Sequence, residues 1–346
     1  MTNITQFEGG GLSGLANLGN TCFINSCMQI FSHTYELNEF LLQGTYKKKL
    51  TPKPESVLLI EWDNLRSALW EKTRMVNPSK FIQTIHKLAK IKGANLFTGF
   101  DQNDASEFFM FIIDCFHTAL AREVTVGITG NPTTDEDRIA IICYEMMKNE
   151  YATNYSEFVK LFFGTMVSQI ISINGHEELS IKSESYCTLS LPIPETSSRQ
   201  SSLLDCFNLF SNGEILANEN AYYNEKTKCK EDVIKKMSFW SIPNILVIDL
   251  KRFNSHNIKN QSLVTFPLDN LDLSSYVIGY DKESYVYNLY GICNHSGGVS
   301  GGHYTSFVKN ANGKWYLFND TNVNEVDASH LISSKAYCLF YRKKTI

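Results

Sequence analysis

The chain has 346 residues and a mass of 39.3 kDa, which suits one large domain with subdomains or two ordinary domains. Hydrophobic residues make up 43% of it, as expected of a packed core, and the net charge of −4 argues against a surface that binds nucleic acid. No apolar run is long enough to cross a bilayer, and the first ten residues do not resemble a signal peptide.

Nine cysteines stand at irregular spacing, and their odd number does not suit a disulfide framework. We therefore expect free thiols in a reducing compartment, either the cytoplasm or the nucleus. We also expect a monomer that makes no contact with a membrane.

The motif GLANLGNTCFINSC, residues 14–27, places one cysteine at the start of a helix predicted over 22–42. Asn20 and Thr21 precede this cysteine and are typical helix-starting residues. A thiol in the first turn lies at the positive end of the helix dipole, which favours the nucleophilic thiolate. Cys22 is thus a candidate nucleophile, and the alternative is a small buried apolar side chain.

Residues 14–120 are predicted to be mostly helical, because apolar residues recur there at helical spacing. In the last of these helices Asn103 or Asp104 can cap the N-terminus, with Glu107 as capping-box partner. A polar loop over 127–136 then precedes one more helix. The helices predicted after the first span 55–70, 78–88, 103–120 and 136–148.

From Phe162 onward the sequence is rich in short runs of aromatic and β-branched residues, which predict strands. Helices first and strands afterwards indicate an α+β fold. A helix carrying the nucleophile and a sheet carrying the base would then face each other across a cleft. The predicted strands lie within 162–173, 186–194, 245–253, 284–295, 303–310, 314–318 and 336–344.

A glycine-rich loop precedes His303, and an Asn-Gly turn signal follows it between two predicted strands. If the turn lies within 310–313, His303 faces a residue between 319 and 322. Asn319 and Asp320 stand there, and either side chain can orient an imidazole. The hairpin therefore predicts a histidine with a polar partner.

Cysteine, histidine and a side-chain amide or carboxylate make up the cysteine form of the catalytic triad. The sequence alone does not bring Cys22 close to His303, because most of the chain separates them. His295 is another candidate base, but no polar residue lies opposite it in a hairpin whose register can be counted.

Taken together, these motifs resemble the ubiquitin-specific protease family, deubiquitinases with a papain-like fold. GLANLGNTCFINS is similar to the family's cysteine box, and DQNDASEFFMFIID is similar to its glutamine–aspartate–glutamate box. LVIDLKRF resembles a strand ahead of the last third of the domain, and AYCLFYRK resembles the closing strand. NHSGGVSGGHYTSFVKN followed by GKWYLFND resembles the histidine box.

The resemblance runs from residue 14 to about 343 and implies a helical thumb, β fingers and a β-rich palm. The expected boundaries are an N-terminal extension over 1–13, a thumb over 14–160, fingers over 161–245 and a palm over 246–346. The family's fingers usually hold zinc between two CxxC pairs, which this sequence lacks. Cys229 alone cannot build a four-ligand site, so we expect fingers without metal and a protein without cofactor.

Carried over position by position, the resemblance implies that Cys22 is the nucleophile, His303 the general base and Asn319 the third triad member. Asn17 falls on the family's oxyanion-stabilising asparagine, where a side-chain amide can donate to the developing charge. Without the resemblance, Asn17 would be interpreted as a turn residue that bonds its own backbone. Asp320 would support the site and would not replace Asn319.

The resemblance also implies a site for the C-terminal tail of ubiquitin, which ends in Leu-Arg-Gly-Gly. Asp104 matches an acidic contact to a tail arginine, and charge-assisted pairs of this kind are strong. His295 matches a histidine of the loop over the tail, which argues against its role as the base. The implied tail-binding residues are Gln102, Asp104, His295, Gly301, Gly302 and Tyr304.

The sequence therefore predicts a thiol-dependent deubiquitinase that hydrolyses the isopeptide or peptide bond after the C-terminal glycine of ubiquitin. Its partners would be ubiquitin and ubiquitinated proteins. One alternative is a protease for another ubiquitin-like modifier, and a second is a catalytically inactive ubiquitin-binding module. A general papain-like peptidase is disfavoured because the resemblance includes the tail-binding box.

Overall fold

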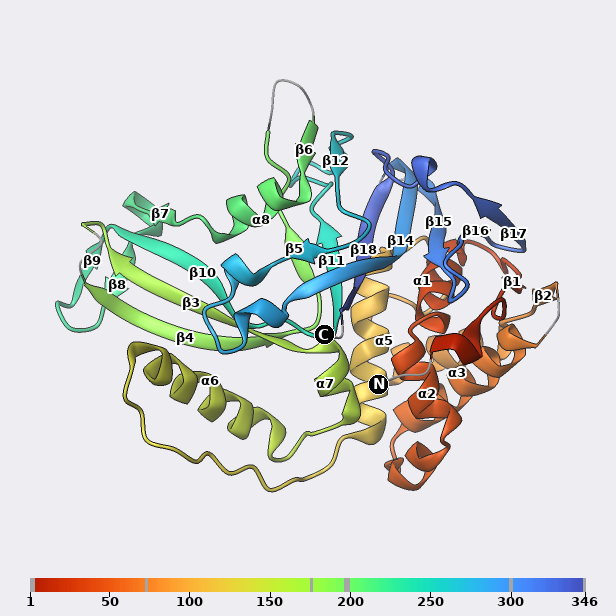
Figure 1. Ribbon diagram of the computed structural model, residues 1–346, viewed down its shortest axis with the longest axis horizontal. Helices are drawn as coiled ribbons and strands as arrows, with labels where there is room; N and C mark the ends of the chain where they lie inside the picture. The colour runs from red at the N-terminus through yellow and green to blue at the C-terminus, as the bar shows by residue number, and fades with distance from the viewer. Residues whose placement is uncertain (1–3, 72–73, 175–176, 196–199, 299–300, 345–346) are drawn as a thin grey trace.

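The computed structural model describes residues 4–71, 74–174, 177–195, 200–298 and 301–344. A cluster of helices forms one half of the molecule, on the right in Figure 1, and a long strand-rich arm extends away from it to the left. The helices come mainly from the first half of the chain and the strands from the second. The predicted α+β class is confirmed. Among the described residues, no helix is both long and apolar enough to cross a lipid bilayer.

The helices begin and end close to the predicted limits, because the sequence supplies their caps. Asp104 caps the long helix after it by accepting hydrogen bonds from the backbone of Ser106 and Glu107. The described α-helices are α1 (Cys22–Ser32), α2 (Tyr35–Leu42), α3 (Pro54–Trp70), α4 (Ser79–Ile91), α5 (Ala105–Leu120), α6 (Asp135–Tyr151), α7 (Glu157–Phe162) and α8 (Leu203–Ser211).

The single helix predicted over 22–42 is wrong, because the chain forms two helices there, α1 and α2. The side-chain amide of Asn38 donates to the carbonyl of Ser32, 2.6 Å away. This bond satisfies one of the carbonyl groups that a helix leaves unpaired at its C-terminus. A residue of the second helix therefore helps to end the first.

The largest sheet has eight strands and carries the C-terminal third of the chain. Seven of them follow the order β17-β16-β15-β14-β18-β11-β5, and the eighth, β13, pairs with β14. The last strand in sequence order, β18, therefore lies inside the sheet. Their bounds are β5 (Leu189–Leu191), β11 (Ile245–Leu250), β13 (Leu271–Asp272), β14 (Val286–Gly298), β15 (Gly301–Lys309), β16 (Trp315–Asn319), β17 (Asn322–Val326) and β18 (Ala336–Lys343).

A second sheet, ordered β4-β3-β10-β7, forms the arm, and α6 packs against β4 along it (Figure 1). Apart from β3, these strands were not predicted, since their exposed faces are polar. The strands are β3 (Gly164–Ser172), β4 (Glu178–Tyr186), β7 (Glu214–Leu216) and β10 (Val233–Ser241). Three strand pairs complete the described fold: β1 (Gly14–Leu15) with β2 (Met75–Val76), β6 (Gln200–Ser202) with β12 (Leu263–Thr265), and β8 (Tyr222–Asn224) with β9 (Cys229–Glu231).

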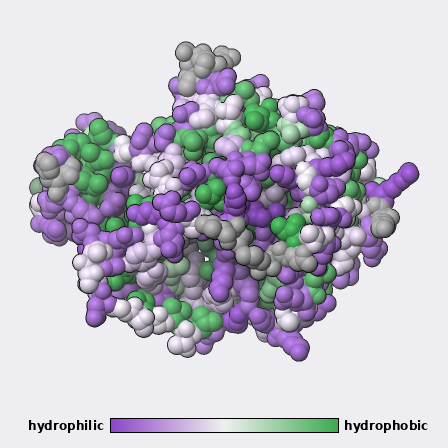
Figure 2. Space-filling view, viewed as in Figure 1, coloured by the Kyte–Doolittle hydropathy of each residue, from purple (hydrophilic) through white to green (hydrophobic). Residues whose placement is uncertain are grey.

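The core places α1 between the helices and the large sheet. Every residue of α1 is buried, and the helix packs against β15 and β14 on one side and α5 on another. Figure 2 shows that the outer surface of the same view mixes hydrophilic and hydrophobic residues, with hydrophobic ones gathered at the left end, over β7. The fold therefore fixes the N-terminus of α1 against the strand that carries His303.

Candidate active site

Cys22 is the first residue of α1, and a tightly hydrogen-bonded loop leads into it. The side-chain oxygen of Asn17 accepts hydrogen bonds from the backbone of Gly19, at 3.0 Å, and of Thr21, at 3.2 Å. Gly19 has a φ of +107°, a conformation that favours glycine. The loop thus fixes where the helix begins.

The backbone amides of Cys22 and Phe23, at the N-terminus of α1, lower the pKa of the Cys22 thiol as expected, but burial outweighs them in this conformation. Burial is the largest influence and raises the pKa of the thiol. The backbone of Tyr304 donates to the sulfur and lowers the pKa, but the charge of Asp320 raises it again. The thiol is therefore neutral near pH 7 in this conformation.

His303, near the start of β15, makes the predicted contact with the neighbouring strand. Its Nε2 atom lies 2.7 Å from Oδ1 of Asn319, the last residue of β16. The ladder pairs Ser306 with Phe318 and Phe307 with Leu317, which agrees with the pairing expected from a turn within 310–313. The hairpin prediction is confirmed.

Asp320 follows Asn319 but faces the helix wall of the site. Its carboxylate accepts from the side-chain amide of Asn17, at 3.0 Å, and from that of Asn25, at 2.8 Å. Its carbonyl accepts from the backbone of Leu15, at 2.9 Å. Asp320 therefore links the loop before α1 to the end of β16. Asn25 was not predicted to belong to the site, although it lies about one helical turn after Cys22.

Cys22 and His303 lie on two elements that pack against each other, α1 and β15. The sulfur of Cys22 contacts the backbone of Tyr304 on β15. Within the described part of the chain, no hydrogen bond joins the thiol to the His303 ring. His303 and Asn319 are thus in contact, while Cys22 lies beside Tyr304, the next residue of the same strand.

A cleft of about 590 Å³ lies between the start of α5 and the ends of β11, β14 and β15. Four of the predicted tail-binding residues line it, namely Gln102, Asp104, His295 and Tyr304. Gln102, at the α5 side, accepts a hydrogen bond of 2.7 Å from the backbone of Gly302. The described lining includes Gln102, Asp104, Glu107, Asp249, Phe253, His295, Tyr304 and Tyr337.

Acidic side chains give this cleft its charge. Asp104 caps α5 with Oδ1 and accepts a hydrogen bond from the Tyr337 hydroxyl with Oδ2, so the predicted capping role is confirmed. Burial raises the pKa of Asp249 to about 6, although a bond of 2.8 Å from Ser190 opposes the shift. Burial, then the charge of Asp104, also raises the pKa of Glu107. Asp249 was not predicted to belong to the site, although a carboxylate within the apolar run ILVIDL is an unusual feature that could have indicated it.

His295 and Tyr304 form an aromatic wall of the cleft, with ring centroids 4.6 Å apart. They are direct partners on the paired strands β14 and β15. Gly302 has no room for a side chain, because a Cβ atom there would lie 2.2 Å from Nε2 of His295. A Cβ at Gly301 would meet only Gln102, at 3.9 Å, so Gly301 is less constrained.

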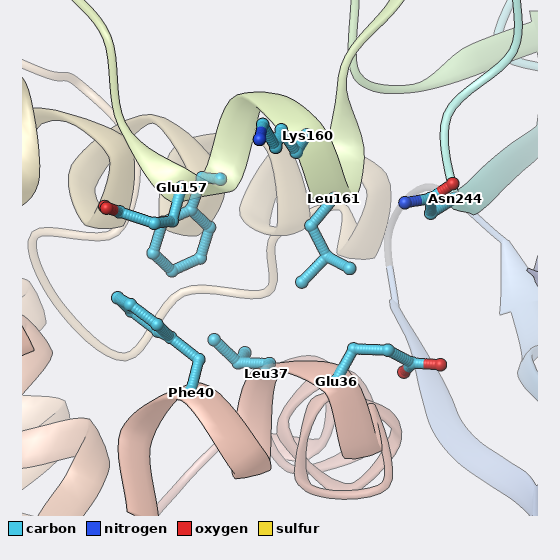
Figure 3. A pocket seen from close by; sticks show the side chains of 8 residues that line it. Glu36, Leu37, Phe40, Glu157, Lys160, Leu161 and Asn244 are labelled. Carbon is cyan, nitrogen blue, oxygen red and sulfur yellow. The ribbon is translucent and has the colours of Figure 1, made fainter. Parts of the chain in front are cut away.

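A smaller pocket of about 150 Å³ lies between α2 and α7, away from these residues. Figure 3 shows Leu37, Phe40 and Leu161 pointing into it, with Glu36 and Asn244 at one end. It contains none of the predicted site residues.

The residues of the arm do not fit a zinc ion. Cys229 is exposed in β9, and the described residues contain no group of three or more His, Cys, Asp or Glu side chains placed to hold a metal. All nine cysteines are free thiols.

Comparisons with known proteins agree with this geometry. A family model described as ubiquitin carboxyl-terminal hydrolase matches residues 13–341. Ubiquitin carboxyl-terminal hydrolase 2 of Bos taurus is 33% identical over 346 residues, which cover 96% of this chain and 55% of that protein. Ubiquitin carboxyl-terminal hydrolase 21 of Homo sapiens is 33% identical over 370 residues, which cover 99% of this chain and 63% of that protein. The chain therefore spans little more than half the length of these relatives.

Solved structures share the fold. A SAGA DUB module, Ubp8/Sgf11/Sus1/Sgf73 bound to monoubiquitin, has a TM-score of 0.75 at 24% identity, covering 97% of this chain and 70% of the matched chain. A structure of the yeast SAGA DUB module has a TM-score of 0.74 at 24% identity, covering 98% and 70%. This likeness concerns the arrangement of the elements and confirms the papain-like fold class.

Proposed function

The chain belongs to the ubiquitin carboxyl-terminal hydrolase family, and from this membership we propose that it is a thiol-dependent deubiquitinase. It would hydrolyse the isopeptide or peptide bond after the C-terminal glycine of ubiquitin. The observation that carries the proposal is the bond of 2.7 Å between His303 and Asn319, on a strand against which the Cys22 helix packs. These are the base, orienting residue and nucleophile of a cysteine hydrolase.

The hydrogen bond to Asn319 assigns the protons of His303. The Oδ1 atom of Asn319 accepts, so Nε2 of the ring carries a proton and Nδ1 of the neutral ring keeps its lone pair. In the proposed reaction Nδ1 takes the proton of the Cys22 thiol while the sulfur attacks the glycine carbonyl. The leaving amine receives that proton, and water, activated by the same ring, then hydrolyses the thioester.

Asn17 is proposed to stabilise the oxyanion of the tetrahedral intermediate. One N–H of its amide donates to Asp320, and its oxygen holds the loop before α1. The second N–H has no hydrogen-bond partner among the residues the structure describes, and it would donate to the developing charge together with backbone amides near Cys22. Asn17 thus combines the turn role and the oxyanion role, and Asp320 holds the amide in place.

The tail of ubiquitin is proposed to occupy the cleft beside the triad. Asp104 would pair with a tail arginine, because the cleft combines carboxylates with aromatic walls. Gly301 and Gly302 would lie along the tail's glycines, where small residues allow the two backbones to approach. The bond from Gly302 to Gln102 supports the position of this strand relative to α5.

The division into an N-terminal extension, thumb, fingers and palm is proposed with the boundaries expected from the sequence. We also propose a monomer of the cytoplasm or nucleus, with metal-free fingers, that acts on ubiquitinated proteins and binds neither nucleic acid nor membranes. The arm sheet and the packing of α6 against β4 support fingers held by strand pairing and side-chain contacts.

A ubiquitin probe with a C-terminal electrophile tests the function directly. The wild-type protein should form a covalent adduct, and Cys22→Ala should abolish it. Cys27→Ala is the matched control, because Cys27 lies on the same helix but its thiol is buried against the carbonyl of Ala105. Labelling that survives Cys22→Ala, or a wild type that reacts only with probes of other ubiquitin-like modifiers, would overturn the proposal.

A further inference from the structure

Lys259, which the catalytic scheme does not use, contacts a cleft residue directly. It lies in the loop after β11, and its ammonium group is 2.9 Å from Nδ1 of His295 and 2.7 Å from the carbonyl oxygen of the same residue. The ammonium also lies 5.9 Å from the centroid of the Phe253 ring, another cleft residue. Two walls of the cleft are thus joined through one lysine.

This contact determines where the proton of His295 lies. An ammonium group has three donors and no acceptor, so Nδ1 of His295 must accept. Burial, then the neighbouring Lys259 charge, lower the pKa of His295 to about 4, so the ring is neutral near pH 7. A neutral ring that accepts at Nδ1 carries its one proton on Nε2.

The Nε2 atom faces the glycine-lined side of the cleft. It lies so close to Gly302 that a Cβ there would be only 2.2 Å away. His295 is 4% exposed and lines the cleft, and Nε2 has no hydrogen-bond partner within the described ranges. An N–H group in this position is a donor with no acceptor among the described residues, and it is not one of the buried atoms without a hydrogen-bond partner, so it can donate to a bound ligand.

We propose that Lys259 is a positioning residue that fixes His295 in its Nε2–H tautomer, so that this N–H donates to a main-chain carbonyl of the bound ubiquitin tail. The inference rests on the proposed function, because the tail is the ligand. The other tautomer would present a lone pair to the tail carbonyl, and two acceptors repel each other. Lys259 therefore selects the form of His295 that can bind.

The loop has a second anchor besides Lys259. Arg252 anchors its base by donating to the carbonyl oxygens of Asn260, at 3.0 Å, and Ser262, at 2.9 Å. The guanidinium also donates to the carbonyl of Ala336, 2.6 Å away on β18. Replacing Lys259 should thus remove the contact to His295 and leave the loop attached to the sheet.

The test combines two variants with two measurements. Lys259→Met removes the donor while keeping a long side chain, and Lys259→Arg restores a side chain that only donates. The ring ¹⁵N shifts of His295 should report the Nε2–H tautomer in wild type and Lys259→Arg, and a mixture in Lys259→Met. With a fluorogenic ubiquitin substrate, KM should rise about five- to tenfold in Lys259→Met, as for a lost hydrogen bond, with less change in kcat. Lys282→Met, at an exposed lysine outside the cleft, is the control.

Wild-type shifts that place the proton on Nδ1 would overturn the inference, as would a Lys259→Met protein with unchanged tautomer and KM. A Lys259→Arg protein as impaired as Lys259→Met, with an intact tautomer, would also overturn it, since the lysine would then act by its shape alone. If the wild type fails to turn over ubiquitin, the proposed function itself fails, and the ¹⁵N shifts still decide the role of Lys259 toward His295.

Discussion

The strand wall and the helix wall of the proposed active site differ in how the fold positions and ionises their proposed catalytic groups. On the strand wall, His303 already contacts Asn319 at 2.7 Å. On the helix wall, burial raises the pKa of Cys22, and the described residues include no hydrogen bond from its thiol to the base. The fold alone therefore orients the proposed base, whereas in the same conformation it keeps the thiol of the proposed nucleophile mainly protonated.

The largest loss of activity is expected from removing the imidazole ring of His303. His303→Ala should lower kcat/KM for a fluorogenic ubiquitin substrate by roughly 10³-fold, because general base catalysis is lost. His330→Ala, at an exposed histidine in another part of the molecule, should leave turnover unchanged. A His303→Ala protein that keeps more than a tenth of the activity would show that the strand wall does not supply the base.

Asn319 and Asp320 are neighbours at the end of β16, and we expect them to have different roles. Asn319 would orient the base, and Asp320 would support the loop before α1. Asn319→Ala should lower kcat by roughly 10²-fold, because the His303 ring loses the acceptor that fixes it. Asp320→Ala should reduce kcat less, because the residue contacts Asn17 and Asn25 and not the base. It should lower the free energy of unfolding by about 1–3 kcal/mol, since both amides lose their acceptor.

Steady-state kinetics and chemical denaturation measure the two effects separately. If Asp320→Ala reduced kcat more than Asn319→Ala does, the assignment of the third triad member would be reversed. The unfolding measurement then tells whether that loss reflects chemistry or a weakened fold.

A smaller effect should follow from filling the space beneath His295. In Gly302→Ala the new Cβ would lie 2.2 Å from Nε2 of His295 and 2.7 Å from the carbonyl of Ser296, so the ring must move. We expect KM to rise on the order of tenfold, as for an overpacked site. Gly298→Ala is the control, because a Cβ there meets nothing within 4 Å. Equal kinetics in the two variants would contradict the close fit of this strand to His295.

The pH dependence of the rate at which a small reagent alkylates Cys22 should show how little of this thiol is ionised near pH 7. Because burial and the charge of Asp320 raise the pKa of the Cys22 thiol, its thiolate fraction at neutral pH is small. The rate of Cys22 alkylation should thus rise about threefold for each half unit between pH 7 and pH 8.5. The alkylation rate of the Cys22→Ala protein gives the contribution of the other thiols, which is subtracted from the wild-type rate. A rate that is already constant at pH 7 would mean that the thiolate forms without substrate.

Local signals predicted most of the fold and the strand wall of the site. An Asn-Gly turn and alternating strands are short-range features, so the hairpin that joins His303 to Asn319 could be counted from the sequence. The cap at Asp104 and the start of α1 at Cys22 were accessible for the same reason.

The remainder depends on contacts between distant segments, which no local pattern encodes. The pKa of Cys22 depends on burial beneath β15 and on Asp320, almost 300 residues away in the chain. The break between α1 and α2, the carboxylate of Asp249 in the cleft and the contact of Lys259 with His295 likewise arise from packing. Most strands of the arm were missed because their polar exposed faces weaken the apolar pattern.

The position of β18 inside the large sheet has a consequence for synthesis on the ribosome. This strand lies between β14 and β11, so the two parts of the sheet cannot join until residues 336–343 have emerged. A nascent chain would meanwhile expose two unpaired strand edges, which are prone to aggregate. We therefore expect chaperones to bind the unfinished chain, and expect hydrolytic activity only after the last strand has been inserted.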